Sequence, residues 1–353
     1  MAPVLLELRR RPRCEALFVA TAQHREMLDQ VCAAFDLRPD VDLDLMRPDQ
    51  TLADVTARVL LGVRDVLRDL APDAVLVHGD TTTCLASTLA AFYAGVPVGH
   101  VEAGLRTHDL AAPWPEEMNR RLTDPLARWC FAPTARAAEN LRAERVLESA
   151  IHVVGNTVVD ALELALERNR VRPPTIPDLP SGALEGRKLV LVTGHRRESF
   201  GPPLRELCSA LREVVDRRED TVLVYPVHLN PNVRAPVHEL LGGHPRIHLV
   251  RPLEYLPFVA LLARATVIVT DSGGIQEEAP TLGVPVLVTR AATERPEAIE
   301  QGLARLVGTS RAALVPELDR ALSLSRASAP PAPNPYGDGR ASQRIADVLL
   351  REL

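Results

Sequence analysis

The chain of 353 residues lacks the features that mark several other classes of protein. None of its apolar runs approaches the roughly 18 residues that a transmembrane helix needs. Its formal net charge is −5 and it has no long basic run, so we expect neither nucleic acid nor a membrane surface as a partner. At the N-terminus the charged residues follow the apolar ones, the reverse of a secretory signal peptide, and we expect a cytoplasmic protein.

Cysteine and lysine are both scarce. The five cysteines are scattered and form no Cys-x-x-Cys pair, which predicts free thiols in a reducing compartment instead of disulfides or zinc ligands. Lys188 is the only lysine, so arginine supplies almost all of the positive charge. The first half of this sequence therefore offers no lysine for catalysis.

Common nucleotide and metal motifs are missing as well. The chain has no Walker A loop, no His-Glu-x-x-His and no Gly-x-Gly-x-x-Gly after a strand. Asp42 and Asp44 match the Asp-x-Asp of metal-dependent sugar transferases, but the alternating pattern around them predicts a strand whose acids face solvent. We expect no metal site, and we expect arginines and a helix dipole to neutralise any pyrophosphate.

Short apolar runs alternate with helical patterns along the whole chain, which predicts an α/β fold with mainly parallel sheets. A polar, proline-rich passage at 171–180 divides this series into two halves. We expect two Rossmann-like, doubly wound domains that face a cleft, residues 1–155 and 156–334, and a segment 335–353 whose helix packs back on the first domain. The predicted strands are 16–20, 41–46, 74–78, 96–102, 130–132, 151–154, 189–193, 221–227, 247–250, 267–270, 284–288 and 303–307.

The start of the chain departs from this pattern. Parallel α/β domains usually begin with a strand that becomes central to the sheet. This sequence begins with an amphipathic helix that has Val4, Leu5 and Leu8 on one face. We therefore expect the first strand of the N-terminal domain, and the loop after it, to be missing from the sequence.

The most informative segment is 271–278, Asp-Ser-Gly-Gly-Ile-Gln-Glu-Glu, which follows the apolar run 265–270. A strand, a two-glycine turn and a helix that ends near Gly283 make an anion site, because the first helical N–H groups point at the ligand. The two carboxylates cannot bind phosphate, but they suit the hydroxyls of a ribose. The segment predicts a nucleotide-sugar site, and the alternative is a well-capped turn without a ligand.

Polar side chains follow other predicted strands too. Asp80 is either a carboxylate at the cleft or the N-cap of the next helix. Glu102 is either an acid–base group or a loop residue at the surface. Arg120 follows a proline-led helix start and could neutralise phosphate or be solvated. In the second half, His195 could donate to phosphate or belong to a basic cluster in a loop, and Arg295 could clamp a phosphate or a sugar hydroxyl.

Together and in this order, these motifs resemble those of the bacterial non-hydrolysing UDP-N-acetylglucosamine 2-epimerases over nearly the whole chain. As a set they are far more specific than any one of them. The matching segments are 21–30, 78–83 (His-Gly-Asp-Thr-Thr-Thr), 100–106 (His-Val-Glu-Ala-Gly-Leu-Arg), 113–117 (Pro-Trp-Pro-Glu-Glu), 194–201, 225–232, 271–278, 293–297 and 334–339.

The resemblance implies a GT-B fold, usually as a homodimer, and interconversion of UDP-GlcNAc and UDP-ManNAc without a cofactor. The family reaction eliminates UDP across carbons 1 and 2 of the sugar to leave a 2-acetamidoglucal. UDP then adds back after the opposite face of carbon 2 is protonated. Because the proton on carbon 2 is only weakly acidic, the reaction needs carboxylates poised as base and acid in a closed cleft.

Motif by motif, the resemblance also implies roles for single residues. The catalytic carboxylates are Asp80, Glu102 and Glu116, with base and acid left open among them, and His195 assists the departure of UDP. The substrate-binding residues are Ser272 and Gly273 at the phosphates, Glu278 at the ribose, Phe258 by the uracil, and Arg120 and Arg295. A second UDP-GlcNAc can act as an activator in bacterial members, and the matching positions are Gln23, Arg58 and His228.

One departure from the family concerns the N-terminus. The family begins with a strand, Gly-Thr-Arg-Pro-Glu and a nearby lysine, and the arginine and lysine contribute to the active site. Met1 aligns just after that segment, so we expect a start codon assigned too late and a longer natural protein. The alternative is that the present chain is unstable or weakly active.

Three rival functions remain open from the sequence. The first is a hydrolysing relative that releases ManNAc, and the second is a GT-B glycosyltransferase. The third is an inactive protein that binds a UDP-sugar. Three carboxylates at the predicted cleft favour proton chemistry over transfer of a sugar to an acceptor.

Overall fold

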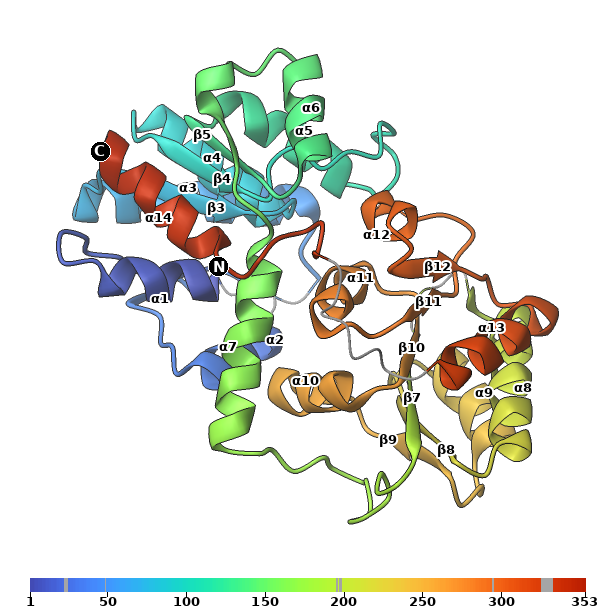
Figure 1. Ribbon diagram of the computed structural model, residues 1–353. Coiled ribbons are helices and arrows are strands. Elements are labelled where there is room, and N and C mark those ends of the chain that lie inside the picture. Colours follow the sequence, from blue (N-terminus) through green and yellow to red (C-terminus); the bar gives the residue numbers. More distant parts are fainter. Residues whose placement is uncertain (22–24, 48, 195, 197–198, 294, 325–332) are drawn as a thin grey trace. The chain divides into compact units, whose positions relative to one another are not determined.

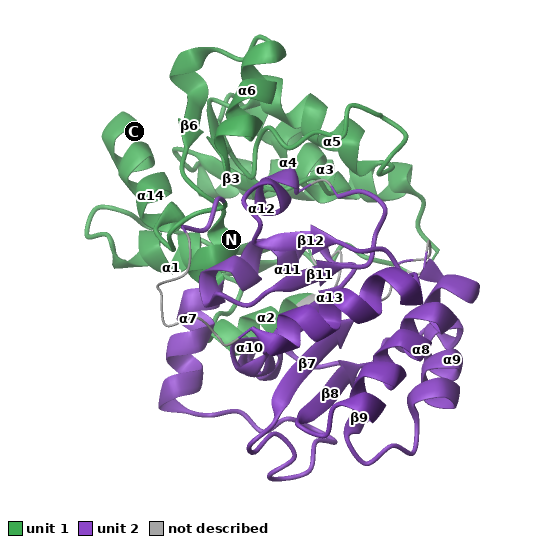
Figure 2. Ribbon diagram, turned by 45° about the vertical axis from the view of Figure 1, so that its right-hand side comes forward, with its two compact units in different colours: residues 1–161, 336–353 green, residues 162–335 purple. Residues whose placement is uncertain are grey.

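The computed structural model describes residues 1–21, 25–47, 49–194, 196, 199–293, 295–324 and 333–353 (Figure 1). The chain forms two compact units, which are coloured separately in Figure 2. Unit 1 comprises Met1–Ala161 and Tyr336–Leu353, and unit 2 comprises Leu162–Pro335. No helix within the described ranges is long and apolar enough to cross a membrane.

The main sheet of unit 1 is four-stranded and parallel, in the order β3-β4-β5-β6. Its strands are β3 (Val75–His78), β4 (Val98–Val101), β5 (Trp129–Ala132) and β6 (Ile151–Val153). The helices of this unit are α1 (Ala2–Arg10), α2 (Arg25–Phe35), α3 (Leu52–Leu70), α4 (Thr82–Tyr93), α5 (Glu116–Thr123), α6 (Ala135–Ala143), α14 (Ala341–Glu352) and the 3₁₀ turns η1 (Asp124–Leu126) and η2 (Glu148–Ala150). Helix α7 (Thr157–Val171) runs from unit 1 into unit 2.

Two predicted strands near the N-terminus are shorter than expected. They reduce to β1 (Val19–Ala20) and β2 (Val41–Asp42), which pair with each other in a separate parallel sheet. The prediction of a strand as far as residue 46 was wrong because Asp44 has a left-handed backbone, φ 42°, which ends the extended run. Asp42 and Asp44 are exposed as expected, and both accept hydrogen bonds from the Arg25 guanidinium, at 2.6 Å from Asp42 and 2.9 Å from Asp44.

Helix α3 shows how the sequence sets the core of unit 1. Thr51 caps its start in a reciprocal capping box with Asp54, which satisfies the first free N–H groups. Apolar residues every fourth position then form one buried stripe that packs on the sheet and on α4. The stripe consists of Val55, Val59, Val63 and Leu67.

The two terminal helices of the chain, α1 and α14, lie side by side in unit 1 (Figure 1). Val4 and Leu8 of α1 are buried with Ile345 and Leu349 of α14 in one apolar cluster. The start of α14 is held by Asp160, whose carboxylate accepts the main-chain N–H groups of residues 341 and 342 at 3.1 and 2.7 Å. A helix predicted from the sequence thus joins the apolar core of the first unit.

The sheet of unit 2 is six-stranded and parallel, in the order β12-β11-β10-β7-β8-β9. Its strands are β7 (Lys188–Thr193), β8 (Thr221–Pro226), β9 (Ile247–Val250), β10 (Val267–Thr270), β11 (Val286–Val288) and β12 (Ala304–Leu306). Its helices are α8 (Pro202–Arg217), α9 (Pro231–Leu241), α10 (Tyr255–Arg264), α11 (Gly273–Glu278), the 3₁₀ turn η4 (Ala279–Leu282), α12 (Pro296–Glu300) and α13 (Arg311–Ser323).

This strand order is that of the doubly wound fold, in which the chain winds outward from the middle in both directions. The change of direction falls between β7 and β10, which are neighbours in register from Val190 opposite Val267 to Thr193 opposite Thr270. Ligands of such sheets bind outside the carboxyl ends of the strands at this switch point. The predicted anion segment 271–278 begins there.

Candidate active site

In unit 1, Asp80 and Glu102 lie on adjacent turns at the carboxyl edge of the sheet. The register of β3 and β4 sets His78 opposite Val101, so both strands end at the same level. The N–H of Gly79 donates to the Val101 carbonyl at 3.0 Å, and a Cβ on Gly79 would lie 3.6 Å from the Glu102 carboxylate. The structure therefore brings together two of the carboxylates that the sequence singled out.

Asp80 is not the N-cap of the following helix, so that alternative was wrong. Thr81 caps α4 instead, because its hydroxyl accepts the N–H of Cys84 at 3.3 Å. The carboxylate of Asp80 lies 3.4 Å from the Arg120 guanidinium, and its main-chain carbonyl accepts the Asn119 side-chain amide at 2.8 Å. The Asp80 side chain is 36% exposed, although it is paired with Arg120.

Glu102 is held in an unusual conformation by its neighbours. Its backbone is left-handed, φ 67°, which costs a residue with a side chain about 1–2 kcal/mol. The Asn156 amide donates to one carboxylate oxygen at 2.8 Å, and His78 Nε2 lies 3.4 Å from the other. Burial lowers the pKa of His78 to about 4, so a neutral ring faces Glu102 at neutral pH.

Helix α5 carries the third predicted carboxylate and the predicted arginine. Glu116 is its first residue and is half-buried. Its neighbour Glu117 is fully buried and accepts the main-chain N–H groups of residues 107 and 108, at 3.1 and 3.0 Å. The Arg120 side chain reaches Glu117 at 3.2 Å, an ion pair without hydrogen-bond geometry, as well as Asp80. Arg120 therefore links Asp80 to the buried end of the helix.

In unit 2, the loops after β7 and β10 meet at the switch point. The Thr193 and Thr270 hydroxyls are 2.7 Å apart across the two strands. The N–H of Arg196 donates to the buried carboxylate of Asp271 at 2.9 Å. Position 195 lies outside the described residues, so the predicted role of His195 stays a prediction.

The anion segment forms the expected turn and helix. Helix α11 is followed by η4, and the left-handed Gly283, φ 63°, ends the helical stretch at the predicted residue. The N–H of Ser272 donates to the Thr270 hydroxyl at 2.9 Å, which fixes the turn. A Cβ on Gly273 would lie 3.1 Å from the guanidinium carbon of Arg295, which a 2.8 Å hydrogen bond to Glu277 holds over the helix start. A side chain at 273 would therefore require the guanidinium to shift by a few tenths of an ångström.

Glu278 is a buried carboxylate at the end of α11, with only 5% of its surface exposed. Tyr255 donates to it from α10 at 3.0 Å. Burial, the largest influence, raises the pKa of Glu278 to about 7, although the hydrogen bond from Tyr255 opposes it. Phe258 lies one turn after Tyr255, on the same face of α10, and is half-buried.

The three predicted activator residues belong to different parts of the chain, and the structure does not test them as a set. Arg58 is exposed on α3 of unit 1, and His228 is exposed in unit 2, where its ring accepts the N–H of Asn230 at 3.1 Å. Gln23 lies outside the described residues. Their shared role remains a prediction.

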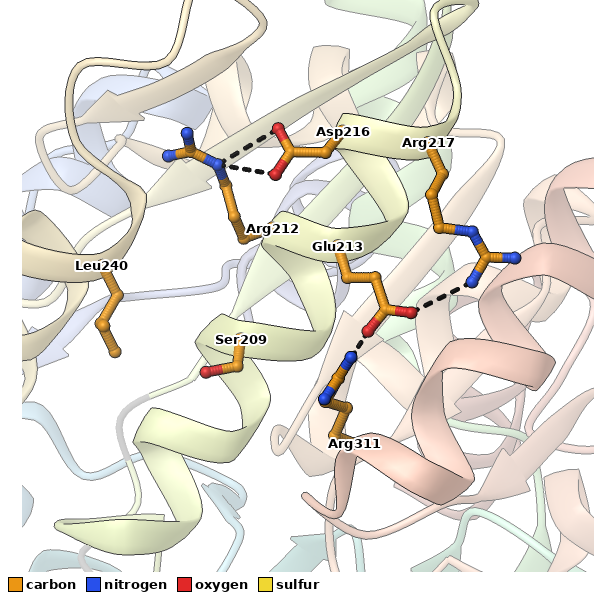
Figure 3. Close-up of a pocket in the computed structure, with 7 residues that line it drawn as sticks. All are labelled: Ser209, Arg212, Glu213, Asp216, Arg217, Leu240 and Arg311. Carbon is orange, nitrogen blue, oxygen red and sulfur yellow. Dashed lines mark hydrogen bonds and ion pairs between the residues drawn. The ribbon is translucent and has the colours of Figure 1, made fainter.

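A hollow on the surface of unit 2 is lined by none of the predicted site residues (Figure 3). Its two carboxylates are both paired, Asp216 with Arg212 and Glu213 with Arg217 and Arg311. Exposed ion pairs of this kind contribute little to stability, and both carboxylates already have arginine partners. The hollow is lined by Ser209, Arg212, Glu213, Asp216, Arg217, Leu240 and Arg311.

Several polar residues at the site were missed from the sequence. Asn156 and Asn119 hold Glu102 and Asp80, Tyr255 holds Glu278, and Glu117 anchors Arg120. Asn156 follows a predicted strand in the same way as Asp80 and Glu102, and this position was the one available signal. The others depend on contacts between distant segments.

These features define a parallel α/β protein with carboxylates at neighbouring strand ends and a phosphate-type turn at the switch point of a doubly wound sheet. The family model described as UDP-N-acetylglucosamine 2-epimerase matches residues 6–350. The UDP-N-acetylglucosamine 2-epimerase of Escherichia coli K12 is 51% identical over 360 residues, which cover 99% of this chain and 94% of the relative.

Two solved structures are similar along nearly their whole length. The UDP-GlcNAc 2-epimerase of Neisseria meningitidis, bound to UDP-GlcNAc, has 43% identity and a TM-score of 0.87, covering 99% of this chain and 96% of that one. The Methanocaldococcus jannaschii UDP-GlcNAc 2-epimerase, in complex with UDP-GlcNAc and UDP, has 32% identity and a TM-score of 0.78, covering 99% and 95%. The chain belongs to the UDP-N-acetylglucosamine 2-epimerase family of isomerases, which confirms the resemblance found in the sequence.

Proposed function

We propose that this chain interconverts UDP-GlcNAc and UDP-ManNAc without hydrolysis, by eliminating UDP to a 2-acetamidoglucal and adding it back. The observation that carries the proposal is the 51% identity to the Escherichia coli epimerase over 99% of the chain. The bound UDP-GlcNAc of the Neisseria meningitidis relative supports the same substrate. The pairing of Asp80 and Glu102 at one sheet edge is what the proton transfers at carbon 2 require.

The architecture we propose is a GT-B arrangement with a UDP-sugar cleft, in the form of a homodimer. Unit 1 contributes the carboxylates, and the doubly wound unit 2 contributes the nucleotide site. The switch point of unit 2 supports this assignment, since doubly wound sheets bind nucleotides at that place.

In unit 2, the phosphates of UDP would lie at the start of α11. The hydroxyl of Ser272 makes no capping hydrogen bond, and the N–H of Gly273 belongs to the first helical turn, where the dipole favours an anion. Arg295, held by Glu277, adds positive charge beside Gly273. Glu278 would accept the ribose hydroxyls, Phe258 would stack by the uracil, and His195 would assist the departure of UDP.

In unit 1, Asp80, Glu102 and Glu116 would divide the base and acid roles at carbon 2. The neutral His78 and the Asn156 amide hold Glu102 without neutralising its charge, so it can accept a proton. Asp80, in contrast, lies beside the positive Arg120 guanidinium at 3.4 Å. Two carboxyls in unlike surroundings suit the two roles, and which of the three is the base stays open.

The test is proton NMR of UDP-GlcNAc incubated with the protein in D2O, with EDTA and no added cofactor. We expect UDP-ManNAc that carries deuterium at carbon 2. Free ManNAc would instead identify a hydrolysing enzyme, and turnover only with an added sugar acceptor would identify a glycosyltransferase. Tight binding of UDP-GlcNAc without turnover would leave an inactive binding protein.

Allosteric activation by a second UDP-GlcNAc is a separate part of the proposal, with Gln23, Arg58 and His228 as its residues. The reverse reaction from UDP-ManNAc should start slowly and accelerate when a trace of UDP-GlcNAc is added. Hyperbolic kinetics without such activation would refute this part and leave the epimerase assignment intact.

A further inference from the structure

His100 is a fully buried histidine in the middle of the unit 1 sheet, on β4. Its ring lies between two oxygen atoms from distant segments. Nδ1 is 2.6 Å from the carboxylate of Asp124, and Nε2 is 2.8 Å from the main-chain carbonyl of Gly79. Both ring nitrogens therefore contact groups that accept hydrogen bonds.

The protonation of the ring follows from these partners. A carbonyl oxygen can only accept, so Nε2 carries a hydrogen. Asp124 is ionised, because burial opposes its charge but the permanent positive charge of the Arg106 guanidinium, which donates to its second oxygen, favours the carboxylate and helps to lower its pKa. An ionised carboxylate also accepts, so Nδ1 carries a hydrogen too, and His100 is an imidazolium cation.

Further charges lie around this cation. Arg106, whose side chain is fully buried, pairs with Asp124 and with Glu144, and the more exposed Arg121 also pairs with Glu144. Other titratable groups nearby are His78 from β3, Cys84 from α4 and Cys130 from β5, and burial raises the pKa of Cys130. Burial alone lowers the pKa of His100, but the Asp124 carboxylate outweighs it and holds that pKa well above its ordinary value.

The cluster is connected to all three carboxylate-bearing segments of the proposed site. Gly79 immediately precedes Asp80, and Gly104 lies two residues after Glu102. Asp124 directly follows α5, which carries Glu116.

The segment after Glu102 is also locked by packing around Gly104. A Cβ on Gly104 would lie 2.2 Å from the Ala137 carbonyl, and the Asn140 amide donates to the Gly104 carbonyl at 2.9 Å. Loss of the His100 contacts would therefore release the Asp80 turn more than the Glu102 turn.

We infer that His100 is a positioning residue whose buried imidazolium, paired with Asp124, fixes the Asp80 turn against the Glu102 turn for proton transfer. The catalytic part of this inference rests on the proposed epimerase function. The alternative is a neutral histidine that only fills space in the core. The two hypotheses differ in the protonation state of the ring and in which kinetic constant depends on the His100 side chain.

The first experiment reads the protonation of the ring in the unaltered protein. Nitrogen-15 NMR of histidine-labelled protein at about pH 8, well above the ordinary pKa of about 6.5, should show one ring with both nitrogens protonated. The signal is assigned by its disappearance in His100→Gln. A neutral tautomer for His100 at that pH would overturn the inference, whatever reaction the protein catalyses.

The second experiment separates positioning from folding. His100→Gln should lower kcat by roughly 10- to 100-fold, as expected for a misplaced catalytic group, while KM and the Kd for UDP change less than about threefold. UDP binding reports only on unit 2, where its proposed site lies, so circular dichroism and the melting temperature check that unit 1, which contains His100, is folded. Unchanged kcat, or a parallel loss of kcat and UDP affinity, would overturn the positioning role.

The matched control is His152→Gln, on β6 of the same sheet. His152 packs against Phe131, with ring centroids 5.8 Å apart, and its buried Nε2 has no hydrogen-bond partner in the described part of the chain. We expect it to retain the kcat of the unaltered enzyme. A second variant, Asp124→Asn, removes the counter-charge and should both lower kcat and abolish the imidazolium signal at pH 8. Persistence of that signal would also overturn the inference, and an unaltered protein without epimerase activity would refute the proposed function alone.

Discussion

The Tyr255 hydroxyl donates a 3.0 Å hydrogen bond to the buried carboxylate of Glu278, across from α10 to α11. This bond stabilises the ionised form of a group whose pKa burial raises to about 7. Since ribose hydroxyls donate best to an ionised carboxylate, we expect the proposed role of Glu278 at the ribose to couple UDP binding to pH near neutrality.

Tyr255→Phe should therefore weaken UDP binding by roughly tenfold near neutral pH, because it removes a bond to a charged group. Calorimetry from about pH 6 to 9 should show that the affinity of the unaltered protein for UDP rises as the pH passes about 7. In the variant, the same rise should occur at a higher pH. Tyr93→Phe, at an exposed ring of α4, is the control. Because UDP ionises equally in both experiments, comparison with this control removes the contribution of UDP itself to the pH dependence. Superimposed curves for the two variants would contradict the role of Tyr255.

Asn156 offers a test of Glu102. Its amide donates to the Glu102 carboxylate at 2.8 Å, so Asn156→Asp would place a second carboxyl against it with little change in shape. Two carboxylates at this distance repel each other, which strongly raises the pKa of one of them. We therefore expect kcat to fall by about 100-fold, while the affinity for UDP is preserved. Gln301→Glu, the same chemical change at an exposed position, should be silent. A kcat within twofold of the unaltered value would argue against Glu102 as a catalytic group.

Gly104 is predicted to be irreplaceable for stability. Its φ is 84°, and a Cβ would lie 2.2 Å from the Ala137 carbonyl, so Gly104→Ala combines backbone strain with a clash. We expect the free energy of unfolding to fall by about 2–4 kcal/mol in chemical denaturation. Gly95→Ala, at φ 70° with open space around it, isolates the strain and should cost about 1 kcal/mol. Equal losses at the two positions would mean that the clash is relieved at no cost.

The charge pair His100–Asp124 makes stability depend on pH in a defined direction. The pKa of His100 is raised by Asp124 against the effect of burial, so its stabilisation is complete below about 6.5 and is lost as pH rises through the raised folded-state pKa. Burial opposes ionisation of Asp124, but His100 and Arg106 lower its pKa, and its contribution is lost only as pH falls below about 3.8. The melting temperature should therefore decline at alkaline pH, and less steeply in His100→Gln. Parallel declines in the two proteins would contradict this assignment.

Local sequence patterns predicted the fold well where the residues of a helix or strand themselves determine where it begins and ends. The strands at 247–250 and 267–270 match the structure residue for residue, because apolar periodicity and flanking polar residues set them. The sequence could not predict the left-handed Asp44, or Thr81 instead of Asp80 as a cap, since each depends on one dihedral angle or one side-chain rotation.

The polar contacts that hold His100 and Glu102 could not be predicted from the sequence. Asp124 is 24 residues from His100, and Asn156 is 54 residues from Glu102. Nothing local makes a histidine in an apolar strand choose a carboxylate that follows a helix. Such pairs form because each buried polar group must find a partner once the sheet has assembled, so only the tertiary structure identifies them.

Gly273 and Arg295 provide the sharpest test of the nucleotide site. A methyl group at 273 would lie 3.1 Å from the Arg295 guanidinium carbon, and Glu277 restrains that side chain from moving away. Gly273→Ala should therefore weaken UDP binding by about 1 kcal/mol, roughly fivefold in Kd, by shifting the arginine from the phosphates.

A double-mutant cycle shows whether the effect of Gly273→Ala acts through Arg295. In an Arg295→Ala background the methyl group meets no guanidinium, so Gly273→Ala should have almost no further effect on the Kd for UDP. Additive losses would mean that the methyl group hinders the ligand directly and that Arg295 contributes independently. The coupling energy therefore decides whether the glycine serves the approach of the arginine or the approach of the phosphate.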